Sequence, residues 1–252
     1  MKGVGKPLVS IIMPAYNVED DILVALERVR RAMAGFSYEV IVVNDGSVDG
    51  TRRVLEGLRD GCVKVVNHVV NLGKGAAVKT GVEHAEGEYV VILDADRDID
   101  AGSIKRYIDV LRVYDVIVGS KRHPASTYQA PILRKVLSLG FNALVKLLLG
   151  IRVGDTQTGF KAFKAKHLKM IMKVIVVKRY SWDAEVLAVA NLLKLRVAEA
   201  PVQIRQERLF KVRDVLRMFL ELLGIVYRLR VLRWYQRNLG KEDPHYKLLL
   251  KI

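Results

Sequence analysis

Residues 89–96, which spell Tyr-Val-Val-Ile-Leu-Asp-Ala-Asp, decide the fold because an apolar run ends there in a cluster of carboxylates. The run 89–93 is rich in strand-forming residues, which predicts a strand covered on both faces of a sheet. Acidic residues then occupy alternate positions, at Asp94, Asp96, Asp98 and Asp100. Magnesium in proteins takes one or two carboxylates together with phosphate oxygens. The pattern therefore indicates a metal site, and its alternative is a solvated acidic turn that caps the next helix.

The surrounding sequence alternates between predicted strands and predicted helices. Short apolar runs predict strands at 8–13, 39–43, 63–67, 89–93 and 116–119. Helical periodicity fills 19–34, 49–59, 75–85 and 101–113. This alternation predicts an α/β fold with a mostly parallel sheet flanked by helices and joined by right-handed crossovers. Ligands of such sheets bind beyond the carboxyl ends of the strands, which is where the acidic loop falls.

After residue 120 the regular alternation stops. The pattern predicts helices at 132–149, 166–174 and 183–193, a strand at 197–204 and a long basic amphipathic helix at 207–237. We therefore predict a catalytic domain over residues 1–205 and a basic amphipathic helical segment over 206–252. That segment either lies on a membrane surface or packs on the domain, since amphipathic helices do both.

The charge of the chain is unevenly distributed. The formal net charge is +15, yet residues 1–115 hold 15 basic and 18 acidic side chains. Residues 116–182 hold 13 basic side chains against one acidic residue, Asp155, and residues 183–252 hold 14 against 8. A basic block of this kind predicts an anionic partner: phosphate groups, a membrane surface or nucleic acid.

The apolar segments and the cysteine content indicate where in the cell the protein resides. The beginning of the sequence lacks the apolar stretch of a signal peptide, and no uncharged run reaches the ~18 residues of a spanning helix. The single cysteine, Cys62, suits a reducing compartment. We therefore expect a peripheral protein at the cytoplasmic face of a membrane.

Polar and aromatic residues follow the predicted strands and together indicate a nucleotide pocket. Tyr16 can cover the face of a base, Asp45 can accept from a base N–H, and Gly46 permits a tight turn. The segment 71–75 lacks the phosphate-loop pattern of nucleoside triphosphatases, and the first strand lacks the Gly-rich dinucleotide fingerprint. Both of those nucleotide-binding classes are excluded.

Four stretches carry a family resemblance: VSIIMPAYNVEDDI at 9–22, YEVIVVNDGSVDGT at 38–51, NLGKGAAVKTGVEHAEGEYVVILDAD at 71–96 and DTQTGFKAF at 155–163. In this order they resemble the family 2 glycosyltransferases of GT-A fold. Within that family they are most similar to the polyprenyl-phosphate branch, which includes the dolichyl-phosphate glucosyltransferases and the dolichyl-phosphate mannose synthases. The resemblance implies a nucleotide-sugar donor, a divalent metal, Mg²⁺ or Mn²⁺, and inverting transfer to a lipid phosphate.

The resemblance also implies roles for individual residues. The implied donor-binding residues are Pro14, Ala15, Tyr16, Glu19, Asp45, Lys74 and Asp94. The implied metal ligands are Asp94, Asp96 and Asp98, although relatives often have Gln at the last position. The implied acceptor-phosphate residues are Arg134, Ser138 and one of Lys121 and Arg122. Gln157 and Lys161 fall in the segment that lines the sugar and acceptor site, and Asp96 and Asp155 are the candidate catalytic residues.

The predicted reaction needs little general-base catalysis. A phosphate monoester has a second pKa of about 6, so the acceptor is mostly a dianion at neutral pH. The protein must instead offset the repulsion between two anions and stabilise the leaving diphosphate. Asp155 either orients the sugar or acceptor, accepts a proton, or balances local charge as a loop carboxylate.

Several alternatives stay open at the level of the sequence. UDP-glucose or a UDP-N-acetylhexosamine is the favoured donor because 155–161 resembles those branches, and GDP-mannose is possible. The acceptor could instead be a soluble glycan or protein. A nucleic-acid-binding module fits the charge alone, but the basic half has no recognisable nucleic-acid motif. A non-catalytic nucleotide-sugar binder fits poorly with Asp94 and Asp96.

Overall fold

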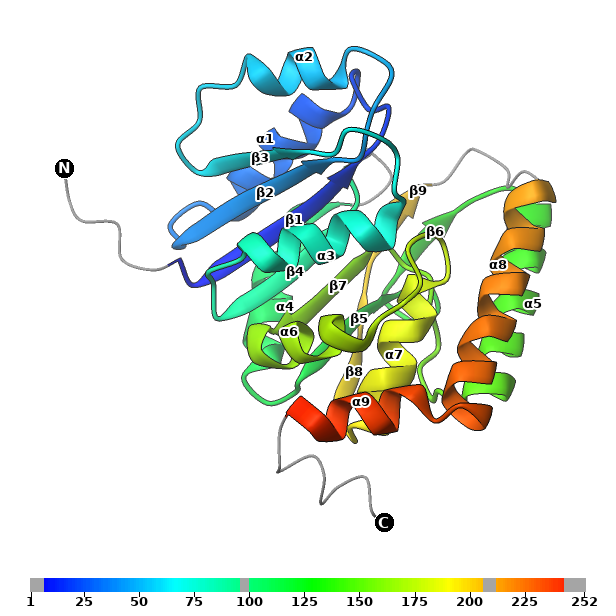
Figure 1. Cartoon of the computed structure of the whole chain (residues 1–252). Helices are drawn as coiled ribbons and strands as arrows, with labels where there is room; N and C mark the ends of the chain where they lie inside the picture. Colours follow the sequence, from blue (N-terminus) through cyan, green and yellow to red (C-terminus); the bar gives the residue numbers. More distant parts are fainter. Residues whose placement is uncertain (1–6, 96–99, 206–211, 243–252) are drawn as a thin grey trace.

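The protein is described by a computed structural model that covers residues 7–95, 100–205 and 212–242 (Figure 1). Its centre is a seven-stranded sheet with the strand order β3-β2-β1-β4-β7-β5-β8. The strands are β1 (Val9–Ala15), β2 (Tyr38–Asn44), β3 (Val63–Asn67), β4 (Tyr89–Leu93), β5 (Val116–Ser120), β7 (Phe160–Lys164) and β8 (Val197–Pro201). β7 runs antiparallel to both of its neighbours, and the other pairs are parallel. The predicted α/β fold with a mostly parallel sheet is confirmed.

Helices cover both faces of this sheet (Figure 1). They are α1 (Ile22–Ala32), α2 (Thr51–Glu56), α3 (Lys74–His84), α4 (Ile104–Leu111), α5 (Ile132–Leu149), α6 (Ala165–Val174), α7 (Trp182–Leu192), α8 (Val212–Val226) and α9 (Trp234–Glu242). A short 3-10 turn, η1 (Ala101–Ser103), precedes α4, and a π-helical turn, η2 (Tyr227–Val231), follows α8. A separate two-stranded parallel ribbon pairs β6 (Thr127–Gln129) with β9 (Gln203–Arg205).

The strand order places a topological switch point between β1 and β4. The chain proceeds from β1 outward through β2 to β3, and then returns to place β4 on the other side of β1. Loops that leave β1 and β4 at their carboxyl ends therefore diverge, which opens a crevice at that edge of the sheet. Tyr16 and Asp94 are the residues that directly follow these two strands.

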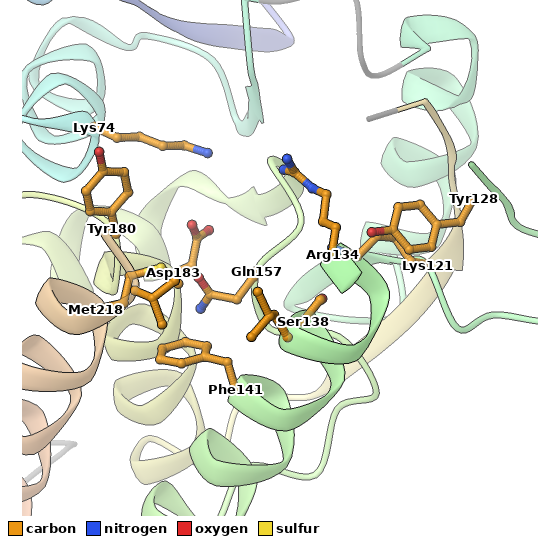
Figure 2. Close-up of a pocket in the computed structure, with 12 residues that line it drawn as sticks. Lys74, Lys121, Tyr128, Arg134, Ser138, Phe141, Gln157, Tyr180, Asp183 and Met218 are labelled. Atoms are coloured by element: carbon orange, nitrogen blue, oxygen red, sulfur yellow. The ribbon is translucent and has the colours of Figure 1, made fainter. Parts of the chain in front are cut away.

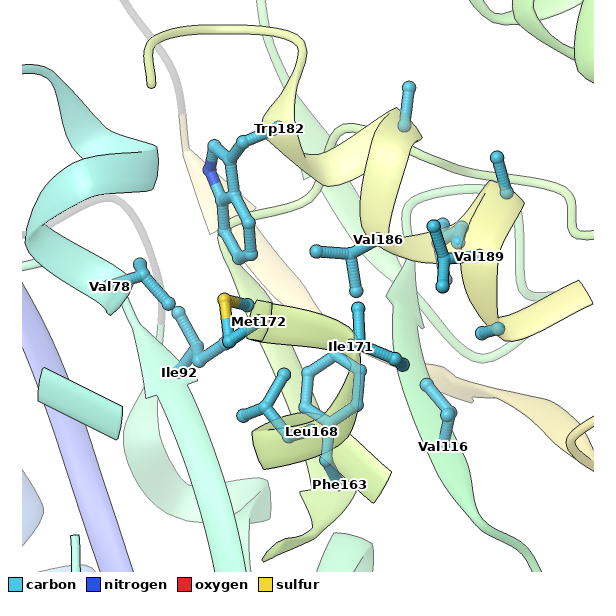
Figure 3. Packing of buried hydrophobic residues seen from close by; sticks show 14 of the residues in the cluster. Val78, Ile92, Val116, Phe163, Leu168, Ile171, Met172, Trp182, Val186 and Val189 are labelled. Carbon is cyan, nitrogen blue, oxygen red and sulfur yellow. The ribbon is translucent and has the colours of Figure 1, made fainter. Parts of the chain in front are cut away.

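Two hydrophobic clusters, one on each face, hold the layers together. On one face, Ala77 of α3, Leu168 of α6 and Val186 of α7 pack with the sheet. Figure 3 shows Trp182 and Met172 packing in this cluster beside Ile92 of β4. On the other face, residues of α1, α2 and α4 cover the sheet. Since both faces are covered, the strands carry nearly continuous apolar runs rather than alternating ones.

The sequence did not predict β7. Its residues 160–164 are Phe-Lys-Ala-Phe-Lys, and two lysines in five residues conceal a central strand. The first lysine is tolerated at 1% exposure because its ammonium pairs with a buried carboxylate. The predicted strand at 197–204 is also divided, into β8 and β9, on either side of Val202.

The prediction of one long helix over 207–237 is wrong for the part that the structure describes. α8 passes into the π-helical turn η2 and ends, Arg233 takes a left-handed conformation with φ 48°, and α9 starts in a new direction. The change of direction lets Leu222, Ile225, Tyr235 and Leu239 all reach the core. A straight helix could present only one face to the domain.

Large apolar side chains on α5 and α8 stay exposed. On α5 they are Ile132, Leu133, Val136, Leu137, Leu139 and Leu147, and on α8 they are Leu216, Phe219, Leu220 and Leu223. The two helices lie side by side at one end of the molecule (Figure 1). Among the described residues, no helix combines the length and apolarity needed to cross a bilayer.

Candidate active site

A cleft of about 470 Å³ opens at the switch point, over the carboxyl ends of β1 and β2. Pro14, Ala15, Tyr16, Asp45 and Lys74, all predicted as donor-binding residues, line this cleft. Its other lining residues are Val18, Asn71, Gly73, Ala95, Arg179 and Tyr180. We call it the strand-end cleft. A volume of several hundred Å³ suits a nucleotide-sized ligand.

Asp45 is fixed in the cleft by three donors. One carboxylate oxygen, Oδ1, accepts from His68 Nδ1 at 2.7 Å and from the Leu72 N–H at 2.9 Å. The other, Oδ2, accepts from the Gly73 N–H at 2.7 Å. His68 Nε2 lies 3.0 Å from Thr80 Oγ1, so with the ring proton on Nδ1 the Thr80 hydroxyl donates to Nε2. The side chain is thereby oriented, and Oδ2 keeps a lone pair for a base N–H.

The predicted donor-binding residue Glu19 does not line the strand-end cleft. Its Oε2 accepts from the Gly50 N–H at 2.6 Å, at the start of α2. Its backbone N–H donates to Asp49 at 3.3 Å. In this structure Glu19 therefore joins the loop after β1 to the loop after β2.

Asp94 stands at the end of β4 beside the cleft. Lys74 Nζ lies 2.5 Å from its Oδ1, and its backbone N–H donates to the Gly159 carbonyl at 3.1 Å. A Cβ at position 159 would collide with the Asp94 carboxylate, so any residue larger than glycine would force that carboxylate to move. Asp96 and Asp98 lie outside the described residues. Within the described ranges no group of three or more metal-ligand side chains occurs, and Asp94 is the predicted ligand that can be placed.

A second cavity, of about 150 Å³, adjoins the first. Its lining residues are Lys74, Lys121, Tyr128, Arg134, Leu137, Ser138, Phe141, Gln157, Tyr180, Asp183, Val215 and Met218. We call it the basic cavity, because three cationic side chains reach it. Figure 2 shows Lys74 and Arg134 extending toward each other from opposite sides, above Gln157 and Asp183. Lys74 and Tyr180 line both cavities, so the two spaces meet at these residues.

The structure distinguishes Lys121 from Arg122. Lys121 lines the basic cavity, and its Nζ lies 3.3 Å from Asp155 Oδ2. The exposed Arg122 instead donates to the Gly154 carbonyl and is absent from the cavity lining. Burial lowers the pKa of the Lys121 ammonium, while Asp155 opposes that shift. A cation so poorly solvated has a strong preference for an anion in the cavity.

Asp155 is 1% exposed and is engaged by its own loop. Its Oδ2 accepts from the Thr158 hydroxyl at 2.7 Å and from the Lys121 N–H at 3.1 Å, and its Oδ1 accepts from the Gln157 N–H at 3.1 Å. Burial by itself raises the pKa of Asp155, but Lys121 and these donors outweigh burial and hold it below its usual value. Asp155 thus connects the loop that carries Gln157 to the start of the Lys121 loop.

Lys161 lies beneath the basic cavity rather than in its lining. Its Nζ donates to the Thr158 carbonyl at 2.5 Å and pairs with Asp183, which is 3% exposed. Asp183 itself reaches the cavity from the first turn of α7. Lys161 therefore neutralises a carboxylate at the cavity floor.

The sequence did not predict Tyr128, Arg179, Tyr180 or Asp183 as site residues. Tyr128 lies beside two ammonium groups, with Lys121 Nζ 5.5 Å and Lys135 Nζ 5.7 Å from its ring centroid. Arg179 Nη1 donates to Asn71 Oδ1 at 3.1 Å, next to the strand-end cleft. The tetrapeptide Arg179-Tyr180-Ser181-Trp182, just before a predicted helix, was the available signal, because cations and aromatic residues in loops often mark binding sites.

Comparison with known proteins agrees with this geometry. The sequence profile described as glycosyl transferase family 2 matches residues 10–171. The chain belongs to glycosyl transferase family 2. Among curated proteins, this glycosyltransferase is 33% identical to dolichyl-phosphate beta-glucosyltransferase ALG5A of Trichomonas vaginalis over 248 residues, which cover 91% of this chain and 76% of that protein. It is 32% identical to the human dolichyl-phosphate beta-glucosyltransferase, over 77% of this chain and 66% of the human protein.

Solved structures show the fold of the glycosyltransferase. Glucosyl-3-phosphoglycerate synthase from Mycobacterium tuberculosis, in complex with Mn²⁺, UDP and glucosyl-3-phosphoglycerate, superimposes with a TM-score of 0.65. The match covers 88% of this chain and 79% of the synthase at 16% sequence identity. The GT-A fold predicted from the sequence is confirmed.

Proposed function

We propose that the protein transfers a sugar, with inversion, from a UDP-sugar to polyprenyl phosphate, with UDP-glucose as the favoured donor. The observation that carries this proposal is the pair of adjoining cavities that share Lys74 and Tyr180. One suits a nucleotide, and the other combines cations with an apolar wall of Leu137, Phe141, Val215 and Met218. A lipid phosphate requires cations for its phosphate group and an apolar wall for its hydrocarbon chain. The names of the curated relatives support dolichyl phosphate as the acceptor and glucose as the sugar.

The nucleotide occupies the strand-end cleft in this proposal. Tyr16, 46% exposed, is available to cover the base, and Asp45 Oδ2 accepts a base N–H. Uracil and guanine both offer an N–H beside a carbonyl, so Asp45 alone does not select the base. UDP is preferred because the solved GT-A relative holds it.

The acceptor phosphate occupies the basic cavity. Lys121, Arg134 and Ser138 supply donors, and the last two lie one turn apart on α5 so that both can bind one phosphate. These charges offset the repulsion between the two anionic substrates. The phosphate oxygen then attacks the anomeric carbon from the face opposite the leaving diphosphate, which inverts the configuration. Asp155 keeps Lys121 in place and takes no proton in this proposal.

A divalent metal, Mg²⁺ or Mn²⁺, completes the donor site. The carboxylate of Asp94 at the switch point has the oxygen chemistry that such hard cations prefer, and Asp96 and Asp98 of the same loop supply further oxygens. When bound, the metal stabilises negative charge on the leaving diphosphate. Lys74, paired with Asp94, provides a fixed positive charge on the same side.

The exposed apolar faces of α5 and α8 rest on the membrane that holds the acceptor. Both helices contribute to the wall of the basic cavity, through Leu137 and Phe141 of α5 and Val215 and Met218 of α8. A lipid chain that leaves the cavity would run along these faces. Arg213 and Arg217 on α8 add attraction to anionic lipids, each on the order of 1 kcal/mol at low salt. The basic segment predicted over 206–252 would then present α8 to the membrane at the cytoplasmic face, while its buried side chains, such as Leu222 and Tyr235, pack on the domain.

A donor and acceptor panel tests the proposal. Purified protein is incubated with Mn²⁺, with radiolabelled UDP-glucose, UDP-N-acetylglucosamine or GDP-mannose, and with dolichyl phosphate in micelles. The expected result is an organic-extractable glucosyl lipid. Label in a soluble glycan but not in lipid would favour the alternative acceptor. A separate comparison of flotation with anionic liposomes and binding to oligonucleotides tests whether the basic surface binds lipid or nucleic acid.

A further inference from the structure

The loop 175–181, between α6 and α7, joins the two cavities to the C-terminal helices. Arg179 and Tyr180 of this loop line the strand-end cleft, and Tyr180 also lines the basic cavity. The loop is tied to the donor side, where the Lys178 carbonyl accepts from the Ala76 N–H at 3.2 Å. Gly73 and Gly75 let it approach this closely, because a Cβ at either would collide with the Lys178 or Val177 carbonyl.

The same loop is tied to α8 by three hydrogen bonds. The Tyr180 hydroxyl donates to Asp214 Oδ1 at 3.2 Å. The Ser181 N–H donates to Glu221 Oε2 at 2.8 Å, and the Ser181 hydroxyl donates to the Met218 carbonyl at 3.0 Å. These residues occupy one face of α8, while Leu216, Leu220 and Leu223 of the same helix are exposed.

One buried carboxylate, that of Glu185, binds both the loop and the C-terminal helical segment. Glu185 is 0% exposed, and its Oε2 accepts from the N–H groups of Val176 and Val177 in the loop. Its Oε1 accepts from Arg228 Nη2 at 3.3 Å and from the Tyr235 hydroxyl. The loop and the C-terminal segment are therefore fixed to the same side chain.

We infer that Tyr180 is the positioning residue at the junction of the two substrates and that α8 sets its place through Asp214. The inference rests on the proposed function, in which the sugar crosses from one cavity to the other past Lys74 and Tyr180. Figure 2 places Tyr180 beside Lys74, opposite Arg134. With its proton directed to Asp214, the phenol oxygen can accept from a sugar hydroxyl. The helix that faces lipid thus controls the alignment of the donor sugar.

The raised pKa of Tyr180 agrees with this arrangement. Burial raises it most, and the Asp214 carboxylate raises it further. The phenol therefore stays protonated throughout the working pH range and acts by position and hydrogen bonding, not as an acid or base.

A double-mutant cycle tests the inference. Tyr180→Phe keeps the ring but loses the hydroxyl, and Asp214→Asn keeps the shape of its partner but loses the charge. We expect each to lower kcat for transfer to dolichyl phosphate about fivefold, the equivalent of one hydrogen bond, with little change in UDP affinity. Because Asp214 acts through Tyr180, the double variant should be no slower than either single variant. The fraction of UDP-glucose lost to hydrolysis should rise in all three.

Matched controls show whether the effect is local. Tyr114→Phe removes the hydroxyl of a tyrosine of similar exposure that lines neither cavity, and Asp109→Asn removes a helix carboxylate on α4. Both should keep the wild-type kcat and the wild-type ratio of hydrolysis to transfer. Thermal melts of all variants should agree, which separates positioning from loss of folding.

Additive effects in the double variant, or an unchanged kcat in either single variant, would overturn the inference. Failure of the proposed function gives a different result, in which the wild-type protein makes no glucosyl lipid. In that case the rate of UDP-glucose hydrolysis is compared for the wild type, the two single variants and the double variant. Equal rates of hydrolysis in all four would also refute a role for Tyr180.

Discussion

The strand-end cleft and the basic cavity are built by opposite means. The cleft is formed where consecutive strands end, and backbone groups orient its main carboxylate, Asp45. The basic cavity is formed by side chains from α3, α5, α7, α8 and the loops between residues 121 and 180. The donors that fix Asp45 all come from one short segment, residues 68–73, directly after β3. A site made of distant side chains depends on ion pairs such as Lys121 with Asp155 and Lys161 with Asp183.

Charge follows the same division. Residues 1–115, which build the strand ends of the cleft, are slightly acidic, and residues 116–182, which supply most of the lining of the basic cavity, hold 13 basic residues against one acid. A metal-binding site needs carboxylates, while a site for a phosphate acceptor needs cations. Lys74, which lines both cavities, pairs with Asp94 beside the strand-end cleft.

The largest expected effect is at Asp94. Asp94→Asn removes charge from the proposed metal site, and we expect kcat to fall by about 100-fold or more because the leaving diphosphate loses its counter-charge. Asp109→Asn on α4 is the control for loss of a carboxylate outside both cavities. Transfer assays with and without chelator measure the effect. A variant with near-normal, chelator-sensitive rates would remove Asp94 from the metal site.

Arg134 tests the basic cavity alone. Arg134→Ala should lower kcat/KM for dolichyl phosphate by about 10- to 100-fold, because it removes a charge-assisted contact with the acceptor. UDP affinity, measured by calorimetry, should stay unchanged. Lys146→Ala, on the same helix but outside the cavity lining, is the control. Loss of UDP binding in Arg134→Ala would place this arginine at the diphosphate and weaken the division between the cavities.

The difference between the two sites explains which of their residues could be predicted from the sequence. The strand-end cleft and its surroundings could be predicted because Tyr16, Asp45 and Asp94 each come within three residues of the end of a predicted strand. Of the predicted acceptor residues, Arg134 and Ser138 were implied by the family resemblance, and both line the basic cavity. Which of Lys121 and Arg122 faces the cavity depends on the ion pair with Asp155, and the sequence does not contain that information.

The unpredicted elements share a physical cause. β7 was missed because the buried Lys161 is neutralised by Asp183, a residue 22 positions away. The break in the helix at Arg233, after the π-helical turn, was missed because Tyr235 and Arg228 meet at the buried Glu185, which outweighs the local helical pattern. Tyr180 was missed because its place depends on the hydrogen bond to Asp214 of α8, the helix that also supplies part of the wall of the basic cavity. In each case a long-range polar contact overrode local periodicity.

Gly159 links the two sites, and its substitution should give an intermediate effect. A Cβ there would collide with the Asp94 carboxylate, which must move or displace β7. We expect Gly159→Ala to lower kcat about tenfold or more, since misplacing a catalytic group by a fraction of an ångström is costly. Gly140→Ala is the matched control, because a Cβ at that helical position meets nothing within 4 Å. Normal turnover in Gly159→Ala would show that Asp94 tolerates displacement.

The smallest expected effect lies away from both cavities, at Asp115 just before β5. Its Oδ1 accepts from Lys164 Nζ at 3.0 Å, and its Oδ2 accepts from the Arg196 N–H at 3.0 Å. Burial raises the pKa of Asp115, but Arg196 and Lys164 outweigh burial and lower it to about 2. Since the folded-state pKa is depressed, the contribution to stability is present above the unfolded-state pKa of about 3.9 and is lost as pH falls toward 2.

Asp115→Asn should therefore destabilise the protein by about 1–2 kcal/mol at pH 7, and the difference should shrink steadily below pH 4. Urea unfolding of both proteins across this pH range measures it. Transfer kinetics at pH 7 should be unchanged, because Asp115 lines neither cavity. A constant difference in unfolding free energy down to pH 2 would mean that packing, rather than ionisation, accounts for the loss.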